Sequence, residues 1–177
     1  AEGRAQFHVV MGGLRPGTVE PWDASMRDYI RHHWQDVAAK TGQPFDFARF
    51  DDADFIYDTE PGCRAVVTAR SLDSSRTLAL YEALQRGFYA QNLDITDTEV
   101  LADLAQSVGL ERARFTERFA TSAMRQLVAS DFLRTQSFGV QGFPSILCAE
   151  DGKYGFLTLG YRTFDAMQGD FEDWLRA

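Results

Sequence analysis

The sequence predicts an α/β protein in which a large all-helical segment interrupts a small sheet. Near the start, Gln6–Met11 is an almost continuous run of apolar, β-branched and aromatic residues, which is typical of a buried strand. About a hundred residues with helical spacing of apolar side chains follow. The last part of the chain has two strand-like segments, 145–149 and 154–159, joined by the hairpin signal Asp151-Gly152, and then one amphipathic helix.

The first predicted helix has apolar side chains at every third or fourth position from residue 26 to residue 38. Asp23 can cap its start, and Gly42 ends it. The aromatic and acidic segment 43–58 has no clean period, so we expect it to fold irregularly onto the core. Thr59-Glu60-Pro61 then opens a second helix, because proline is tolerated in a first helical turn.

Five more helices complete the pattern. Ser74–Asn92 carries apolar side chains on more than one side and is predicted to be a central, well-buried helix. Thr96-Asp97-Thr98-Glu99 has the pattern of a capping box and starts the next helix. Two helices over about 111–119 and 121–138 follow, and Thr163 caps the last helix of the chain.

The sheet predicted from these elements is thin. It has three short strands, and a strand buried on both faces needs a neighbour on each side. The sequence starts at Ala1 without a methionine. We therefore expect a strand and a helix, on the order of 30 residues together, to precede Ala1 in the intact protein.

Composition excludes several classes of function. Eighteen Lys and Arg against 26 Asp and Glu give a net charge of −8, which argues against a nucleic-acid-binding surface. No apolar run approaches the roughly 18 residues that a membrane span requires. Two cysteines are too few for a disulfide scaffold.

Motifs for metal, phosphate and hydrolase sites are also missing from the sequence. It contains no Cys-x-x-Cys or His-Glu-x-x-His spacing, so no metal site is expected. His33 lies on the apolar face of its helix, which favours a hydrogen-bonded core histidine. Gly12-Gly13 is followed by neither phosphate-loop pattern and is interpreted as a plain turn, and no Gly-x-Ser-x-Gly elbow occurs.

The two cysteines allow two interpretations. Cys63 lies near the start of a predicted helix and beside Arg64, a position that favours a thiolate. Cys148 lies within a predicted strand and is expected to be buried and inert. The simpler interpretation, which we favour, is that both are small buried residues.

The segment before the hairpin, Gly139–Leu147, carries a proline at the mouth of a strand. Such a proline either blunts an edge strand or forms a cis peptide bond in a tight turn. Because Pro144 has no N–H, it leaves the neighbouring backbone available to pair with an extended peptide.

Three segments, Phe7–Gly17, Thr59–Val67 and Val140–Ser145, resemble the DsbA-like branch of the thioredoxin superfamily, most closely its FrnE-like members. The resemblance implies a thioredoxin-like fold with a large all-helical insertion. It places residues 1–20 and 139–177 in the thioredoxin-like domain, incomplete at its N-terminus, and residues 21–138 in the insertion.

The resemblance also implies a substrate site. Pro144 matches the family's cis-proline, and Gly142 and Phe143 would supply backbone groups that bind substrate. The family's catalytic Cys-x-x-Cys belongs to a helix that follows the first strand, and this chain contains no such motif. No catalytic residue is therefore expected in this chain, and neither Cys63 nor Cys148 occupies the motif's positions.

The function implied is thiol–disulfide oxidoreductase or isomerase activity on protein or small-molecule disulfides. One alternative is similarity to kappa-class glutathione transferases and hydroxychromene carboxylate isomerases, which use glutathione; the other is a non-catalytic module that binds a peptide or ligand. No cofactor is expected apart from glutathione under that first alternative. Disulfide-containing substrates are the expected partners, and the two isolated cysteines favour the cytoplasm.

Overall fold

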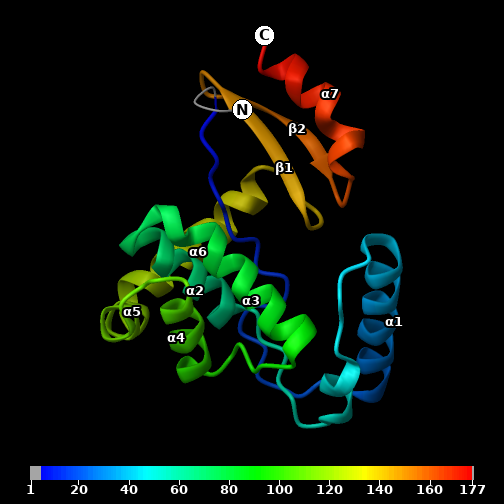
Figure 1. Cartoon of the computed structure of the whole chain (residues 1–177), viewed down its shortest axis with the longest axis vertical. Coiled ribbons are helices and arrows are strands. Elements are labelled where there is room, and N and C mark those ends of the chain that lie inside the picture. Colours follow the sequence, from blue (N-terminus) through cyan, green and yellow to red (C-terminus); the bar gives the residue numbers. More distant parts are fainter. Residues whose placement is uncertain (1–4, 177) are drawn as a thin grey trace. The chain divides into compact units, whose positions relative to one another are not determined.

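The computed structural model describes residues 5–176 (Figure 1). The chain divides into two compact units. Gly13–Ser130 forms a helical unit, and the described residues up to Gly12 form a second unit with those from Asp131 onward. Both junctions between the units lie earlier in the chain than the sequence predicted: at 12/13 where 20/21 was expected, and at 130/131 where 138/139 was expected. The reason is that the helix containing Asp131 binds the backbone of Met11, so its last part groups with the first segment.

The helical unit is built from α-helices and two short 3-10 helices. Its elements are α1 (Ala24–Thr41), η1 (Phe47–Asp51), α2 (Glu60–Leu72), η2 (Ser74–Arg76), α3 (Thr77–Gln91), α4 (Thr98–Ser107), α5 (Arg112–Phe119) and the first part of α6 (Ser122–Ser137). These helices lie where the apolar spacing predicted them, which confirms the helical insertion.

Local capping explains the helix ends. The Asp23 carboxylate caps α1, and Gly42 closes it with a left-handed φ of 69° and an N–H that donates to the Ala38 carbonyl. At α4 the predicted capping box is displaced by one residue. Asp97 is the cap, and its Oδ1 accepts a hydrogen bond of 2.7 Å from the N–H of Glu99.

The helix that is buried on all sides is α2. Eight consecutive residues, Gly62–Ala69, are buried, and α2 contacts α3, α4 and α5. Ser74–Asn92 was predicted to be a central, well-buried helix, but α3 buries one stripe and leaves residues such as Leu78 exposed. Small glycine, cysteine and alanine side chains let the neighbouring helices approach α2 closely.

An aromatic core joins α1 to the irregular segment and to α3. The Trp22 and Phe50 rings stack with centroids 5.2 Å apart, and Trp34 meets Phe88 edge to face at 5.4 Å. The buried members are Trp22, Ile30, Trp34, Phe50, Phe55, Tyr57 and Phe88. The expectation that segment 43–58 folds irregularly onto the core is confirmed.

The second unit contains an antiparallel hairpin and a helix. β1 (Ser145–Glu150) pairs with β2 (Lys153–Leu159) from Ser145↔Leu159 to Glu150↔Lys153, with a bulge between Ile146 and Leu147. Asp151 and Gly152 form the turn, both with positive φ. α7 (Phe164–Trp174) lies against β2, as Figure 1 shows.

The segment Gln6–Met11 does not form the predicted strand. The sheet of the described residues contains β1 and β2 only, and Phe7 and His8 are exposed. At Met11, the one buried residue of this segment, the main-chain N–H donates to Asp131 Oδ2 (3.0 Å) and the carbonyl accepts from Thr135 Oγ1 (3.0 Å). Side chains of α6 thus satisfy a backbone that a neighbouring strand would otherwise pair.

Candidate functional site

The candidate substrate loop is the turn between α6 and β1. Gly139 ends α6 with a φ of 74°, and the Phe143–Pro144 peptide bond is cis. The three residues predicted to bind substrate, Gly142, Phe143 and Pro144, are consecutive and all exposed. The hydroxyl of Ser145 donates to the Gly142 carbonyl at 2.7 Å, which closes the turn on its strand side.

The ring of Phe143 rests on the backbone of Gly12. A Cβ atom at residue 12 would lie 2.0 Å from two ring carbons of Phe143, so any side chain there would force the ring to move. The neighbouring Met11 is fixed by Asp131 and Thr135 of α6, so the surface under the ring is held in place from below. The absence of a side chain at Gly12 therefore lets the aromatic ring of the loop lie directly on its backbone, a role that its interpretation as a plain turn missed.

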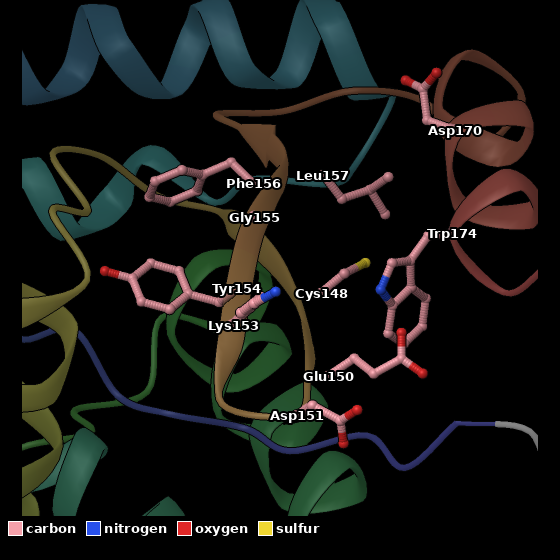
Figure 2. Close-up of a pocket in the computed structure, with 10 residues that line it drawn as sticks. All are labelled: Cys148, Glu150, Asp151, Lys153, Tyr154, Gly155, Phe156, Leu157, Asp170 and Trp174. Carbon is pink, nitrogen blue, oxygen red and sulfur yellow. The ribbon is translucent and has the colours of Figure 1, made fainter. Parts of the chain in front are cut away.

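A second feature of this unit is a groove on the hairpin (Figure 2). The cavity measures about 500 Å³ and is lined by residues of β1, β2 and α7. Cys148 and Trp174 point into it from opposite sides. Three carboxylates, Glu150, Asp151 and Asp170, and one amine, Lys153, surround them, so the rim is acidic.

The thiol of Cys148 is only partly buried, although the sequence led us to expect a buried one. Burial nevertheless raises the pKa of the Cys148 thiol above its ordinary value, so the neutral thiol is the favoured form. Cys63 is buried within α2, with 8% of its surface exposed. The structure thus places Cys63 in the core of the helical unit and Cys148 at the edge of a groove in the second unit.

The described residues show no group of three or more side chains that could hold a metal ion. The prediction of a core histidine at His33 is wrong. His33 is exposed and stacks on the equally exposed Tyr29, with ring centroids 6.3 Å apart, because both lie beyond the edge of the buried stripe of α1. None of the described helices is both long and apolar enough to cross a membrane.

Comparison with known proteins gives a consistent picture. Residues 10–172 match the model of the DSBA-like thioredoxin domain family. A search of curated proteins found no match. The predicted fold class, a thioredoxin-like fold with a helical insertion, is confirmed by this match and by the solved structures described next.

Solved structures with the same fold include proteins of disulfide chemistry. A candidate protein disulfide isomerase from Nitrosomonas europaea is 34% identical, with a TM-score of 0.87 over 91% of this chain and 79% of that one. The cytosolic disulfide reductase DsbM from Pseudomonas aeruginosa is 26% identical, with a TM-score of 0.72 over 96% and 80%. The same reductase with GSH is 27% identical, with a TM-score of 0.75 over 96% and 84%.

Proposed function

The chain belongs to the DSBA-like thioredoxin domain family, and from that membership we propose that it serves thiol–disulfide exchange of the FrnE-like type. Its substrates are disulfides of proteins or of small molecules. The observation that carries the proposal is the exposed loop Gly142–Pro144, which stands at the entrance of β1 with its aromatic ring fixed on Gly12.

The loop suits an extended peptide for two reasons. Pro144 offers no N–H, and the Gly142 carbonyl already accepts one hydrogen bond from Ser145, so the backbone of Phe143 is the part most available to pair with a substrate. The Phe143 ring, 48% exposed, gives an apolar side chain of the substrate a surface to contact.

The role assigned to these residues is binding and orientation. Exchange proceeds when a thiolate attacks one sulfur of the substrate disulfide and forms a mixed disulfide. These 177 residues contain no Cys-x-x-Cys, and we assign the nucleophile to neither Cys63 nor Cys148. A substrate held at the loop would present its disulfide to the thiolate of the exchange reaction.

Glutathione is the small-molecule ligand that we propose to test first. A similar structure, that of a cytosolic disulfide reductase, holds GSH. Because that reductase is cytosolic, we also propose a cytoplasmic location for this protein. The GSH bound to that reductase also keeps the second candidate function open, a glutathione-dependent activity of the kappa-class type. No cofactor is proposed beyond glutathione.

The test is a titration of the isotope-labelled 177-residue chain, followed by backbone amide shifts. The ligands are oxidised glutathione, S-methylglutathione and a peptide with an intramolecular disulfide. We expect the disulfide ligands to shift residues 142–145. Phe143→Ala should weaken that binding about fivefold or more, whereas Phe164→Ala, which removes another exposed phenylalanine ring, should change it less than about twofold.

Four outcomes would contradict the proposal. Shifts confined to other parts of the chain, or equal effects of Phe143→Ala and Phe164→Ala, would remove the loop as the binding site. Equal binding of S-methylglutathione and oxidised glutathione, with none of the disulfide peptide, would favour the glutathione-dependent alternative. Binding of peptides regardless of a disulfide would favour the non-catalytic module.

A further inference from the structure

The helical unit contains a cavity that the proposed function does not use. It measures about 380 Å³ and lies where the chain enters α1, between Arg15 and Met26. Apolar atoms of Val19, Trp22 and Met26 form part of its wall. This volume falls in the range of small-molecule sites in proteins.

Arg15 is the only cation among the residues that line this cavity. Its backbone is fixed, because its N–H donates to Thr59 Oγ1 (2.9 Å) and its carbonyl accepts from the N–H of Thr59 (3.2 Å). One guanidinium N–H donates to Met26 Sδ (3.3 Å), and a thioether is a weak acceptor. The Nε atom is buried and meets no acceptor within the described residues.

A guanidinium in this state is under-satisfied. Arginine carries five N–H donors in a planar fork, and in this half-buried residue the buried Nε–H is the donor that lacks an acceptor. No carboxylate of the described residues lies within 4.0 Å of Arg15. The charge is also felt at Tyr57: burial raises the pKa of that phenol, and Arg15 acts in the opposite direction.

The nearby carboxylates are directed elsewhere. Asp58 Oδ1 accepts hydrogen bonds from the N–H groups of Gly17 (2.8 Å) and Glu60 (2.9 Å). Asp23 Oδ1 accepts from the first turn of α1 at 2.7 Å. Glu20 and Asp23 are both exposed and line the cavity, so both carboxylates would oppose an anion there. Asp23 also caps α1, so Glu20 is the carboxylate that can be neutralised without removing a helix cap.

We propose that this cavity binds a small carboxylate with an apolar body, whose carboxylate pairs with the Arg15 guanidinium and whose apolar part lies against Val19, Trp22 and Met26. The fork of arginine matches the two oxygens of a carboxylate and makes charge-assisted hydrogen bonds, which are about twice as strong as neutral ones. The assignment is independent of the loop at Phe143 and goes beyond disulfide exchange.

The test uses N-acetyl-leucine, a carboxylate with an apolar side chain, and its amide, which has the same shape without the charge. Binding to the 177-residue chain is measured by calorimetry and by ligand-observed NMR. We expect N-acetyl-leucine to bind saturably, with at least about tenfold higher affinity than the amide. Arg15→Gln should weaken binding about tenfold or more, and Glu20→Gln should strengthen it, because it removes the opposing charge.

Arg86→Gln is the matched control, since Arg86 is an exposed arginine of α3 that does not line the cavity, and it should leave the affinity unchanged. Equal affinity for acid and amide, no saturable binding up to about 10 mM, or equal binding by wild type and Arg15→Gln would each overturn the proposal. If Arg15→Gln fails to fold, the decision falls to Glu20→Gln: unchanged or weaker binding by that variant overturns it. The Phe143→Ala variant should bind N-acetyl-leucine like wild type, which separates this test from that of the substrate loop.

Discussion

The contact between Gly12 and the ring of Phe143 gives the sharpest test of the substrate loop. The change Gly12→Ala adds one methyl group directly beneath the ring. The backbone of Gly12 does not lie in the left-handed region, so alanine is conformationally allowed there. The effect of the substitution is therefore steric and acts on a single neighbour.

The size of the effect follows from the geometry. A Cβ at residue 12 would lie 2.0 Å from two ring carbons, whereas carbon atoms in contact are about 3.5 Å apart. The ring must therefore retreat by about 1.5 Å. Phe143 is half exposed and can swing outward, so we expect a loss of only about 1 kcal/mol in the free energy of unfolding, at the low end for overpacking.

The affinity for disulfide ligands should respond more strongly than the stability. Moving the ring removes its apolar surface from the loop, so Gly12→Ala should weaken oxidised glutathione and disulfide-peptide binding about as much as Phe143→Ala does. A double-mutant cycle gives the decisive number. In the Phe143→Ala background the added methyl group meets no ring, so the second substitution should change neither affinity nor stability by more than about 0.5 kcal/mol.

The control is Gly169→Ala in α7, where a Cβ meets nothing within 4 Å. This variant should bind ligands like wild type and gain about 0.5–1 kcal/mol of stability from the helix propensity of alanine. Additive effects of Gly12→Ala and Phe143→Ala in the cycle would refute the steric reasoning. Unchanged ring resonances of Phe143 in the Gly12→Ala variant would refute it as well.

Three further expectations concern the stability contributed by Arg64, the reactivity of Cys148 and the activity of the whole chain. Arg64→Met removes an ion pair to Glu60 (2.9 Å), a hydrogen bond to the Phe119 carbonyl and a contact with the Phe119 ring at 4.0 Å. The free energy of unfolding in urea should therefore fall by about 2 kcal/mol, and a loss below about 0.5 kcal/mol would contradict this. Burial raises the pKa of the Cys148 thiol. In a Cys63→Ser variant, the alkylation rate of Cys148 should therefore reach half of its maximum at a higher pH than the alkylation rate of N-acetylcysteine does. A midpoint at equal or lower pH would contradict this expectation. The 177-residue chain should show no dithiol-dependent insulin reduction above background, since it lacks a Cys-x-x-Cys, and measurable turnover would direct attention to Cys63.

Much of the fold is predictable because its signals are local. Asp23, Gly42 and Thr163 mark helix ends through their own side chains or φ angles, and Asp151-Gly152 specifies its hairpin turn in the same way. Nothing outside a few neighbouring residues is needed to interpret such signals. The helical insertion and the hairpin were therefore visible in the sequence.

The errors arose where distant residues decide the outcome. Whether α2 or α3 is buried on all sides depends on which helices pack around each, and apolar spacing does not report that. Gln6–Met11 has the composition of a strand, yet Asp131 and Thr135, at least 120 residues away, bind the backbone of Met11. The spacing of His33 places it on the same helix face as the buried residues of α1. The stripe of α1 that the core covers is narrower than that face, so His33 stays exposed.

In the candidate site, too, the local features were predicted and the contacts between distant residues were not. The residues of the loop, Gly142 to Pro144, were identified from a short motif and from the family resemblance. The seat of the ring on Gly12 is a contact between distant parts of the chain, so the Gly12-Gly13 pair carried no signal beyond that of a turn. The cavity at Arg15 could not be predicted from the sequence either, because it depends on the three-dimensional arrangement that leaves Nε of Arg15 without a hydrogen-bond acceptor.

The hydrogen bonds that hold Met11 also set an order of events during synthesis. Met11 and Asp131 are 120 residues apart, and at roughly 5–20 residues per second the ribosome needs between about 6 and 24 s to make the chain between them. During that time Gly13–Ser130 emerges as a continuous stretch and can pack its aromatic core. The first segment must wait for α6 before its backbone is satisfied, so the N–H and carbonyl of Met11 stay without these partners for many seconds after they are made.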